Sequence, residues 1–361
     1  MYLKDLVDIQ MGQSPESKFY NYDKIGLPFY QGKADFGKIN PTPKMWCSKS
    51  KKEAKPNDIL ISVRAPVGDL NINNEQSCIG RGLAAITCKS DVDMMYLYYH
   101  LKYLKPQLRH ISTGSTFESI NRSQLENLII KYKSYTEQIK ISNTLQVVQR
   151  QIDVKESLLG LYDLLIKSRF VDMFGDPVLN EKGWNLTSLE SVCQSIYGGG
   201  TPSKKIKEYY MGTIPWVTSK DMKSDIIVDS IEHITQEAID NSSTKIIPPE
   251  SVLIVIRSGI LKHTLPVCIN KSKVTINQDL KALVLDERCK GIYLQYLLKA
   301  LEKDILSGVR AVTADNIEFN SLKKREIPIP PIDIQIKFSQ MVNQINKLKS
   351  DVQKSIDETQ L

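Results

Sequence analysis

The sequence predicts an α+β protein: two strand-rich domains in a pseudo-two-fold arrangement, separated by two long antiparallel coiled-coil helices. Three observations carry this prediction. The two halves of the chain match each other in order, two segments carry an apolar stripe with heptad spacing, and a proline-rich strip runs directly into the second of these segments. With 361 residues, the chain is long enough for two domains that each bury their own core.

Matching segments occur in the same order in both halves of the chain. Near the start, "GQSP" and "LPFYQGK" correspond to "GGTP" and "IPWVTSK", and further on "PNDILISVR" corresponds to "PESVLIVIR". Gln138-Ile139-Lys140 then corresponds to Gln335-Ile336-Lys337, and the offset between partners grows only where loops are expected. We interpret this pattern as an internal duplication of roughly 190 residues, which is too long for a solenoid repeat and indicates a duplicated domain.

Each copy begins with strand-like segments and continues with a helix-like segment. Short apolar runs at 58–63 and 84–88 in the first copy, and at 251–256 and 281–286 in the second, predict strands. Segments 94–108 and 292–306 have helical spacing and follow these strands. An extended strip and a long helix complete each copy.

The two long helices carry a narrow apolar stripe with alternating steps of three and four residues, which is typical of a two-helix coiled coil. The first stripe consists of Leu145, Val148, Ile152, Leu159, Tyr162 and Ile166, and the second of Phe338, Met341, Ile345, Leu348 and Val352. Lys155 interrupts the first stripe as a register-setting polar residue. The alternative is that each helix lies on the surface of its own domain.

The segments that flank the helices predict where the helices begin and end. Gly175 accepts the left-handed conformation of a helix C-terminus, and Pro177 prevents continuation. The strip before the second helix contains Pro328, Pro330 and Pro331, which favour an extended chain, whereas its counterpart in the first copy has no proline. The predicted boundaries are 1–134 and 176–331 for the two domains, with helices at 135–175 and 332–361.

Two similar domains held apart by antiparallel helices suit a ligand with two parts. About 27 helical residues at 1.5 Å each span roughly 40 Å, which is close to the ~34–36 Å of one turn of duplex DNA. Such domains would meet two half-sites on one face of the duplex, with the helices acting as a ruler. The formal net charge of +7 permits a polyanionic partner but is too small to indicate one by itself.

Taken together, these features resemble a known family, the specificity subunits of type I restriction-modification systems. The resemblance is carried by "IPIPPIDIQIKF" entering the second long helix, the domain start "LESVCQSIYGGGTPS", the segment "IPWVTSKDM", and "RFVDMFGDP" at the end of the first helix. It covers nearly the whole chain. Its specificity lies in the ordered, duplicated set of motifs and not in any single one.

The resemblance implies two target recognition domains, each reading half of a bipartite sequence in double-stranded DNA. It implies that the spacer helices also dock two modification (methyltransferase) subunits, and the family adds restriction subunits as further partners. No cofactor is expected in this chain, because the resemblance places S-adenosylmethionine, ATP and Mg in the partner subunits.

The sequence lacks the motifs of a self-sufficient enzyme. No Asn/Asp-Pro-Pro-aromatic loop is present to hold a flipped base, and neither Pro248-Pro249 nor Pro330-Pro331 fits one. No Gly-x4-Gly-Lys-Ser/Thr phosphate loop occurs, and we interpret "YGGGTP" as a structural turn. The tripeptide Asp279-Leu280-Lys281 resembles half of a nuclease signature, a match that chance explains. The six scattered cysteines and four histidines lack metal-site spacing, so we expect reduced thiols and no metal.

Membrane association is not indicated. No segment approaches the ~18–20 apolar residues of a transmembrane helix. The N-terminus lacks the basic, apolar and small-residue regions of a signal peptide. We therefore expect a cytoplasmic protein.

Candidate DNA contacts are polar and basic residues in loops at matching places in the two copies, since such side chains bind base edges and phosphates. In the first copy they are Gln31, Lys33, Lys38, Arg64, Arg81, Thr113, Ser115, Thr116 and Arg122. In the second copy they are Thr218, Ser219, Lys220, Arg257, Lys262, His263, Arg310 and Thr313. Each of them, taken singly, is also compatible with a solvated charge or a turn former.

The leading hypothesis is a non-catalytic DNA-specificity subunit of a type I restriction-modification complex. One alternative is a recognition subunit of another DNA-methylation or defence complex, and another is a coiled-coil interaction scaffold that does not bind DNA. A steep dependence of DNA binding on salt would exclude the scaffold, because binding that neutralises phosphates releases counterions.

Overall fold

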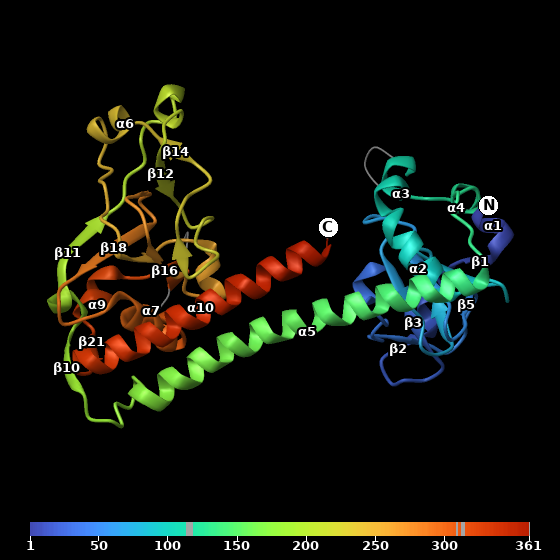
Figure 1. Ribbon diagram of the computed structural model, residues 1–361, viewed down its shortest axis with the longest axis horizontal. Helices are drawn as coiled ribbons and strands as arrows, with labels where there is room; N and C mark the ends of the chain where they lie inside the picture. Colours follow the sequence, from blue (N-terminus) through green and yellow to red (C-terminus); the bar gives the residue numbers. More distant parts are fainter. Residues whose placement is uncertain (113–117, 308–309, 312–314, 361) are drawn as a thin grey trace. The chain divides into compact units, whose positions relative to one another are not determined.

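The computed structural model describes residues 1–112, 118–307, 310–311 and 315–360 (Figure 1). The chain divides into two compact units, Met1–Asp153 and Val154–Leu361. The boundary lies within helix α5 (Tyr135–Phe174), so each unit contains part of that helix. Four of the predicted DNA contacts, Thr113, Ser115, Thr116 and Thr313, lie outside the described residues.

An antiparallel four-stranded sheet forms the centre of the first unit, with the strand order β1-β9-β6-β7. In that order the strands are Val7–Met11, Leu83–Cys88, Ile59–Ser62 and Leu70–Ile72. Helices α2 (Met94–Tyr103) and α3 (Lys105–Ile111) contribute Leu97, Leu101 and Leu108 to the same apolar core as β6 and β9. The predicted strands of this copy are thus present, whereas the predicted helical segment 94–108 is divided into two helices at Leu104.

A second, smaller sheet of the first unit has the order β2-β4-β3-β8-β5. Its strands are Tyr20–Asn21, Trp46–Cys47, Leu27–Tyr30, Ser77–Ile79 and Glu53–Ala54. Strands β3 and β8 pair in parallel, with Tyr30 opposite Ile79. This pairing brings the loop after β3, which begins at Gln31, next to the turn after β8, which contains Arg81.

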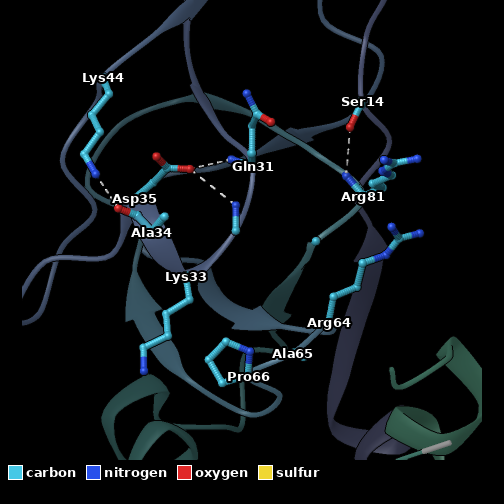
Figure 2. Close-up of a pocket in the computed structure, with 12 residues that line it drawn as sticks. Ser14, Gln31, Lys33, Ala34, Asp35, Lys44, Arg64, Ala65, Pro66 and Arg81 are labelled. Atoms are coloured by element: carbon cyan, nitrogen blue, oxygen red, sulfur yellow. Dashed lines mark hydrogen bonds between the residues drawn. The ribbon is translucent and has the colours of Figure 1, made fainter. Parts of the chain in front are cut away.

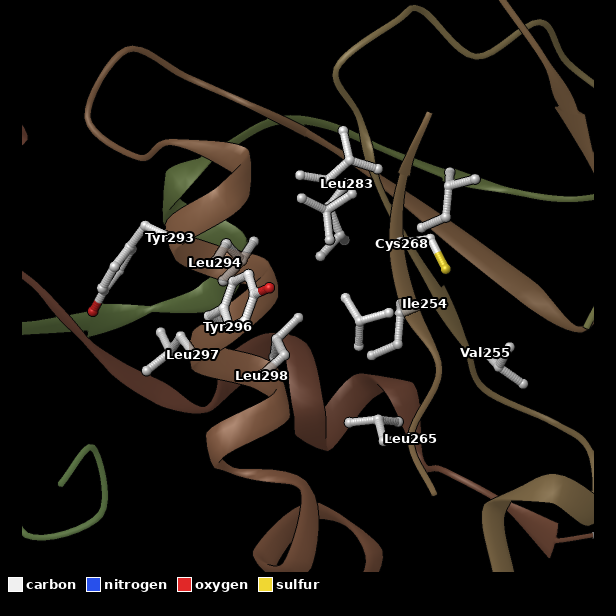
Figure 3. Close-up of a cluster of buried hydrophobic side chains, with 14 of the residues drawn as sticks. Ile254, Val255, Leu265, Cys268, Leu283, Tyr293, Leu294, Tyr296, Leu297 and Leu298 are labelled. Carbon is white, nitrogen blue, oxygen red and sulfur yellow. The ribbon is translucent and has the colours of Figure 1, made fainter. Parts of the chain in front are cut away.

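The second unit is built on a five-stranded sheet with the order β11-β18-β15-β16-β13. Its strands are Cys193–Gly198, Leu280–Leu285, Val252–Val255, Val267–Asn270 and Ile226–Ile227. Helix α7 (Gly291–Ala300) packs on this sheet, and Figure 3 shows Leu294 and Leu298 of the helix facing Ile254 and Leu283 of the strands. A three-stranded sheet, β14-β12-β17, consists of His233–Ile234, Ile214–Val217 and Thr275–Ile276.

The two units repeat the same internal contacts, which supports the duplication seen in the sequence. The parallel pair β3–β8 has its counterpart in β12–β17. Buried Asn73 and Asn270 each donate from Nδ2 to two backbone carbonyl groups, one earlier in the chain and one two residues further along it. Because these polar contacts lie inside each unit, they fix the backbone of both copies in the same way.

Buried glutamines tie each long helix to its own unit. In α5, Gln138 Oε1 accepts from the backbone N–H of Asp93 at 2.9 Å, and its Nε2 donates to Asp91 and Lys133 carbonyl groups. In α10 (Ile332–Gln360), Gln335 Oε1 accepts from the N–H of Lys290 at 2.9 Å. The repeated Gln-Ile-Lys triplet in the sequence therefore marks a repeated anchor between each long helix and the turn before α2 or α7.

Helices α5 and α10 pack against each other in the second unit and run antiparallel. Lys155 Nζ donates to Ser355 Oγ at 2.8 Å, and Lys349 Nζ lies 2.5 Å from Asp163 Oδ1. At the other end of this contact, Phe170 and Phe338 place their ring centroids 5.6 Å apart. As α5 advances, its partners on α10 come from earlier in the chain, so the predicted α+β fold with two long paired helices is confirmed (Figure 1).

The apolar stripe of α10 differs from the predicted one in its register. Leu348 is 48% exposed, whereas Val342 and Ile356 are buried and Lys349 lies at the helix contact through its pair with Asp163. The prediction that Leu348 lies in the seam is therefore wrong for this chain. Leu145 of the α5 stripe is also exposed, whereas Ile152, Ile166, Phe338 and Ile345 are buried, and Val148, Leu159, Tyr162, Met341 and Val352 are partly buried.

The remaining elements are short and connect the sheets and helices. Gly175 has a φ of +77° and follows the last residue of α5, as predicted for a glycine C-cap. Strand β21 (Glu326–Ile329) contains part of the proline strip and pairs with β10 (Asn185–Ser188). At the corresponding place in the first unit, Tyr2 and Ile129 form an isolated bridge. The other helices are α1 (Leu3–Leu6), α4 (Arg122–Glu126), α6 (Gln236–Asp240), α8 (Glu302–Ser307) and α9 (Phe319–Lys324). The 3₁₀ helices are η1 (Ser17–Phe19), η2 (Lys33–Asp35), η3 (Leu189–Val192), η4 (Lys207–Tyr210) and η5 (Gly259–Lys262), and strands β19 (Arg310–Ala311) and β20 (Asp315–Asn316) form a hairpin.

Candidate nucleic-acid interface

A basic pocket of about 690 Å³ opens in the first unit, and it collects four of the predicted DNA contacts (Figure 2). Gln31, Lys33, Arg64 and Arg81 all line it, although they come from three separate places in the sequence. Figure 2 shows Arg64 and Arg81 beside each other on one side of the pocket and Lys33 and Lys44 on the other. The pocket wall therefore offers cationic side chains from opposite sides, as a polyanion requires.

Close backbone packing holds the arginine side of this pocket in place. The turn 80–82 lies against the end of β3, since the N–H of Gly80 donates to the carbonyl of Tyr30 at 2.8 Å. A Cβ added at Gly82 would lie 2.3 Å from the backbone oxygen of Gln31, so the turn requires glycine there. The backbone of Arg81 between these glycines is thereby fixed, and its N–H donates to Ser14 Oγ at 3.3 Å.

An ion cluster orients Lys33 at the opposite wall. Its ammonium lies 3.1 Å from one carboxylate oxygen of Asp69, and Lys105 Nζ lies 2.6 Å from the other. Burial acts to raise the pKa of Asp69, but the hydrogen bonds and charges of Lys105 and Lys33 outweigh it and hold that pKa below its usual value. Asp69 is therefore an anion at neutral pH, and two cations share one negative charge.

Arg64 also borders a second hollow, together with Arg81 and the segment 118–120. Arg64 forms an isolated antiparallel bridge with Ser119, and the N–H of Ala65 donates to the carbonyl of Glu118 at 3.0 Å. The segment 118–120, which follows the predicted contacts Thr113, Ser115 and Thr116 in the sequence, thus lies directly beside Arg64.

The second unit presents an arginine at the equivalent place. Arg257 follows β15 as Arg64 follows β6, and it forms a bridge with Asn316 as Arg64 does with Ser119. Its side chain is about half exposed, with Nε and Nη2 each 2.7 Å from Asp279 Oδ1. Arg64 and Arg257, which the sequence matches placed at equivalent positions, therefore make equivalent backbone contacts in their own units.

The other predicted contacts of the second unit lie on nearby turns. Thr218 follows the parallel strand β12 as Gln31 follows β3, and its N–H and hydroxyl both donate to Asp221 Oδ2, at 2.7 and 2.9 Å. Ser219 and Lys220 continue this turn, and Lys262 and His263 are exposed at the end of η5. Arg310 starts the hairpin strand β19.

Two predicted contacts of the first unit are held by carboxylates outside the pocket. Lys38 Nζ lies 2.8 Å from Asp153 Oδ1 on α5, and it does not line the basic pocket. Arg122 Nε lies 2.6 Å from Glu126 within α4. The structure thus separates these two side chains from the group formed by Gln31, Lys33, Arg64 and Arg81.

Sequence reasoning missed several polar residues that complete these surfaces. Ser14 and Lys44 line the first pocket, and Lys44 Nζ donates to the carbonyl of Ala34 at 2.5 Å. In the second unit, the Thr201 hydroxyl donates to the side chain of Gln278, whereas in the first unit Ser14 Oγ accepts from the backbone N–H of Arg81, the residue equivalent to Gln278. The matched "GQSP" and "GGTP" segments held this signal, because Ser14 and Thr201 are equivalent residues of the two copies.

The thiols offer no reactive or metal-binding centre within the described residues. No group of three potential ligands from His, Cys, Asp and Glu comes together there, and the cysteines are free. Burial is the main cause that raises the pKa to about 12 for Cys78, Cys88, Cys193, Cys268 and Cys289. These thiols remain protonated at neutral pH and so are poor nucleophiles and ligands.

The structure combines a repeated domain, an arginine at the same loop junction in both copies and a pair of long helices. The sequence profile described as "Type I restriction modification DNA specificity domain" matches residues 1–159 and 181–359, which is most of the chain. The chain therefore belongs to the type I restriction-modification specificity subunits, a non-catalytic class of subunit with DNA target recognition domains.

Individual relatives agree with this assignment. The chain is 44% identical over 148 residues to the putative type I restriction enzyme MjaX specificity subunit of Methanocaldococcus jannaschii, which covers 41% of this chain and 35% of that protein. The match thus spans about a third of the length of that relative. A second similarity, to the type I restriction enzyme MjaIX specificity subunit of the same organism, is 26% identical over 383 residues and covers 98% of this chain and 88% of that protein.

A solved structure supports the fold over the whole chain. The type I restriction-modification system S subunit from M. genitalium has a TM-score of 0.60 with this chain at 15% sequence identity, covering 100% of this chain and 92% of that one. At this identity the likeness concerns the fold alone. Within the part of the chain that the structure describes, there is no helix of the length and apolarity that a bilayer crossing demands.

Proposed function

We propose that this chain recognises a bipartite sequence in double-stranded DNA for a type I restriction-modification complex. Each unit reads one half-site, and α5 with α10 sets the distance between the half-sites. The observation that carries this proposal is the repeated arginine, Arg64 and Arg257, at the same junction of strand end and returning loop in both units. Arginine is the side chain that most often reads guanine edges, and it also binds phosphates.

The basic pocket of the first unit supports a DNA ligand over a small-molecule substrate. Its wall combines Gln31, which can read adenine, with cationic Lys33, Arg64 and Arg81. No metal centre or reactive thiol accompanies it among the described residues. Such a lining fits binding of a charged polymer.

We propose further that the helix pair docks two methyltransferase subunits, with a restriction subunit as an additional partner. Leu161, Leu164 and Leu165 of α5 are exposed and share one helix face, and Val154 and Val171 extend that face in both directions. Contiguous exposed apolar surface of this kind marks protein interfaces. The docked subunits would carry the chemistry and its cofactors, S-adenosylmethionine, ATP and Mg.

The experiment that tests DNA recognition is to co-express the chain with a type I methyltransferase subunit and to map methylated adenines across the host DNA by single-molecule sequencing. We expect one motif with two short half-sites and a gap of fixed length. Deleting one heptad from the α5–α10 pair should shorten the gap or abolish methylation. A stable complex that methylates nothing, with no salt-dependent binding to duplex DNA, would favour the interaction scaffold instead.

Docking is tested separately by co-purification with the same methyltransferase subunit. Replacing Leu161 and Leu164 together by aspartate should reduce recovery of the partner at least tenfold, because charges would enter an apolar contact. Met211→Asp is the matched control, since Met211 is 77% exposed and lies outside the helices. Equal recovery with all three proteins would place the docking surface elsewhere.

A further inference from the structure

The two units share one backbone turn but carry different side chains on it. The turn is Gly80-Arg81-Gly82 in the first unit and Asn277-Gln278-Asp279 in the second. In both, the N–H of the first residue donates to the end of the parallel strand, to Tyr30 or Val217. The carbonyl of the third residue accepts from the residue directly before the arginine, Val63 or Ile256. These hydrogen bonds give the two turns the same place in their units, so their side chains can be compared position by position.

In the second unit this turn supplies a carboxylate that holds Arg257. Asp279 Oδ1 accepts from both Nε and Nη2 of the guanidinium at 2.7 Å. Asp279 is itself held, because Asn277 Nδ2 donates to Asp279 Oδ2 at 3.1 Å and Asn277 Oδ1 accepts from the Asp279 N–H at 3.2 Å. Asn277 is 7% exposed, which ties this small network to the interior of the unit.

The pair leaves one edge of the guanidinium available. Arginine has five N–H groups in a planar fork, and Asp279 occupies the edge formed by Nε and Nη2. The end formed by Nη1 and Nη2 still offers two parallel donors, which is the geometry that the O6 and N7 acceptors of guanine require. A guanidinium fixed on one edge also loses less conformational freedom when the other edge binds.

We propose that Asp279 is a positioning residue that aims Arg257 at a guanine in the half-site of the second unit. The inference rests on the proposed DNA-recognition function and adds a base and a mechanism to it. It applies to one half-site only. Among the residues that the structure describes, no carboxylate pairs with Arg64, and the position equivalent to Asp279 is Gly82, where a Cβ would lie 2.3 Å from the Gln31 backbone oxygen.

Arg64 and Arg257 thus differ in the side chains around them, and we expect them to bind different parts of the DNA. Arg64 stands beside Arg81, so the first unit offers two cations that no aspartate of the turn orients. Two such cations suit phosphate groups, whereas Arg257 with its aspartate suits a base edge. The effect of removing the aspartate should therefore appear at one base position of one half-site.

The experiment is a selection of bound sequences from a randomised duplex DNA library by the purified full-length chain at fixed salt, followed by sequencing. The wild type should select two half-sites, one of which contains a guanine at a single position where Asp279→Asn lowers the preference roughly tenfold. Arg257→Lys should lose the same guanine preference, because an ammonium cannot make the paired donation. The other half-site should stay unchanged and so reports that the chain is folded.

Asp286→Asn is the matched control. Asp286 pairs with Arg288 at 2.6 Å in the same unit, outside the repeated turn, and its replacement should leave every base preference as it is. A loss of the guanine by Asp286→Asn as well would mean a general electrostatic effect and would overturn the proposal.

Other outcomes separate the inference from the function on which it rests. If the wild type selects no sequence at all, DNA recognition by this chain fails as a whole. If the wild type selects a bipartite motif but Asp279→Asn changes no base, or lowers affinity for all sequences equally, the positioning role is wrong. A changed preference at an A·T pair in place of a G·C pair would show that the aspartate does not aim Arg257 at a guanine, and that too overturns the proposal.

Discussion

Phe338 is the residue through which α10 enters the core of the second unit, and we expect Phe338→Ala to destabilise that unit strongly. Its side chain is 0% exposed. The centroid of its ring lies 5.6, 5.3 and 5.5 Å from those of Phe170, Phe174 and Tyr296. Because these rings belong to α5 and α7, the single side chain joins three helices.

The expected magnitude follows from area and from ring contacts. A phenylalanine buries roughly 150–250 Å², which at roughly 25 cal/mol per Å² amounts to about 4–6 kcal/mol. Alanine keeps a part of that burial, and measured Phe→Ala changes in cores cost about 3–5 kcal/mol. Three edge-on aromatic neighbours favour the upper half of this range, about 4–5 kcal/mol. For a unit of this size we expect a fall in Tm of roughly 10–15 °C.

Urea unfolding followed by tryptophan fluorescence measures this change. Trp184 is a suitable reporter, since its Nε1 donates to the Phe174 carbonyl at 2.9 Å. The control is Leu348→Ala, which should cost less than about 0.5 kcal/mol because Leu348 is 48% exposed. If Leu348→Ala were as costly as Phe338→Ala, the helix register described above would be wrong and the register predicted from sequence would be right.

Three further predictions concern the helix, the acid stability and the charge of the candidate interface. Gly160→Ala should stabilise the chain by about 0.5–1 kcal/mol in the same urea experiment, because a Cβ there, in the middle of α5, meets nothing within 4 Å. The pKa of Asp69 is held below its usual value, so its ion pairs stabilise the first unit above the unfolded-state pKa, and this contribution is lost as pH falls through the folded-state pKa. Asp69→Asn should therefore cost about 1–2 kcal/mol at pH 7 and much less at strongly acidic pH, as pH-dependent unfolding would measure. Arg64→Ala should reduce the slope of log affinity for duplex DNA against log salt by about 1, and an unchanged slope would mean that Arg64 contacts no phosphate.

Local sequence patterns were sufficient to predict the main strands, the helical segments that follow them and the two long helices, although the segments 94–108 and 292–306 each form two helices in the structure. The strands Ile59–Ser62 and Val252–Val255 lie where short apolar runs indicated them, and the long helix ends before Gly175, as the heptad spacing and the glycine cap indicated. The duplication was visible as well, because residues that anchor a backbone, such as Gln138 and Gln335, recur when the backbone recurs.

The heptad spacing of apolar residues was not sufficient to predict which face of α10 contacts α5. Apolar residues occupy both possible stripes of that helix, and a helix of 3.6 residues per turn drifts relative to a strict heptad. The aromatic contacts of Phe338 and the ion pair between Lys349 and Asp163 decide which stripe faces α5. A sequence rule that favours leucine over lysine at an inner position selects Leu348, whereas the structure places Lys349 at the helix contact.

The sequence indicated candidate interface residues that recur in both copies, but it did not indicate the role of one that occurs in a single copy. Arg64 and Arg257 followed from the alignment of the two copies. Asp279 did not, since the tripeptide Asp279-Leu280-Lys281 was attributed to chance and the contact that gives Asp279 a partner joins residues far apart in the sequence. The role proposed for Asp279 depends on a single ion pair, and a single ion pair produces no periodic pattern in the sequence.

Under the proposed function, in which each unit reads its own half-site, the division between repeated and unrepeated residues has a physical reason. The buried asparagines Asn73 and Asn270, like the two glutamines, bind the backbone and therefore cannot change without disturbing the unit. The middle residue of each turn, Arg81 or Gln278, is exposed, so its exchange leaves the core intact. After the duplication, the buried residues that hold the backbone could thus stay the same while the exposed turn residue changed. Under the proposed function, the two units could then come to recognise different half-sites without any change in how each unit folds.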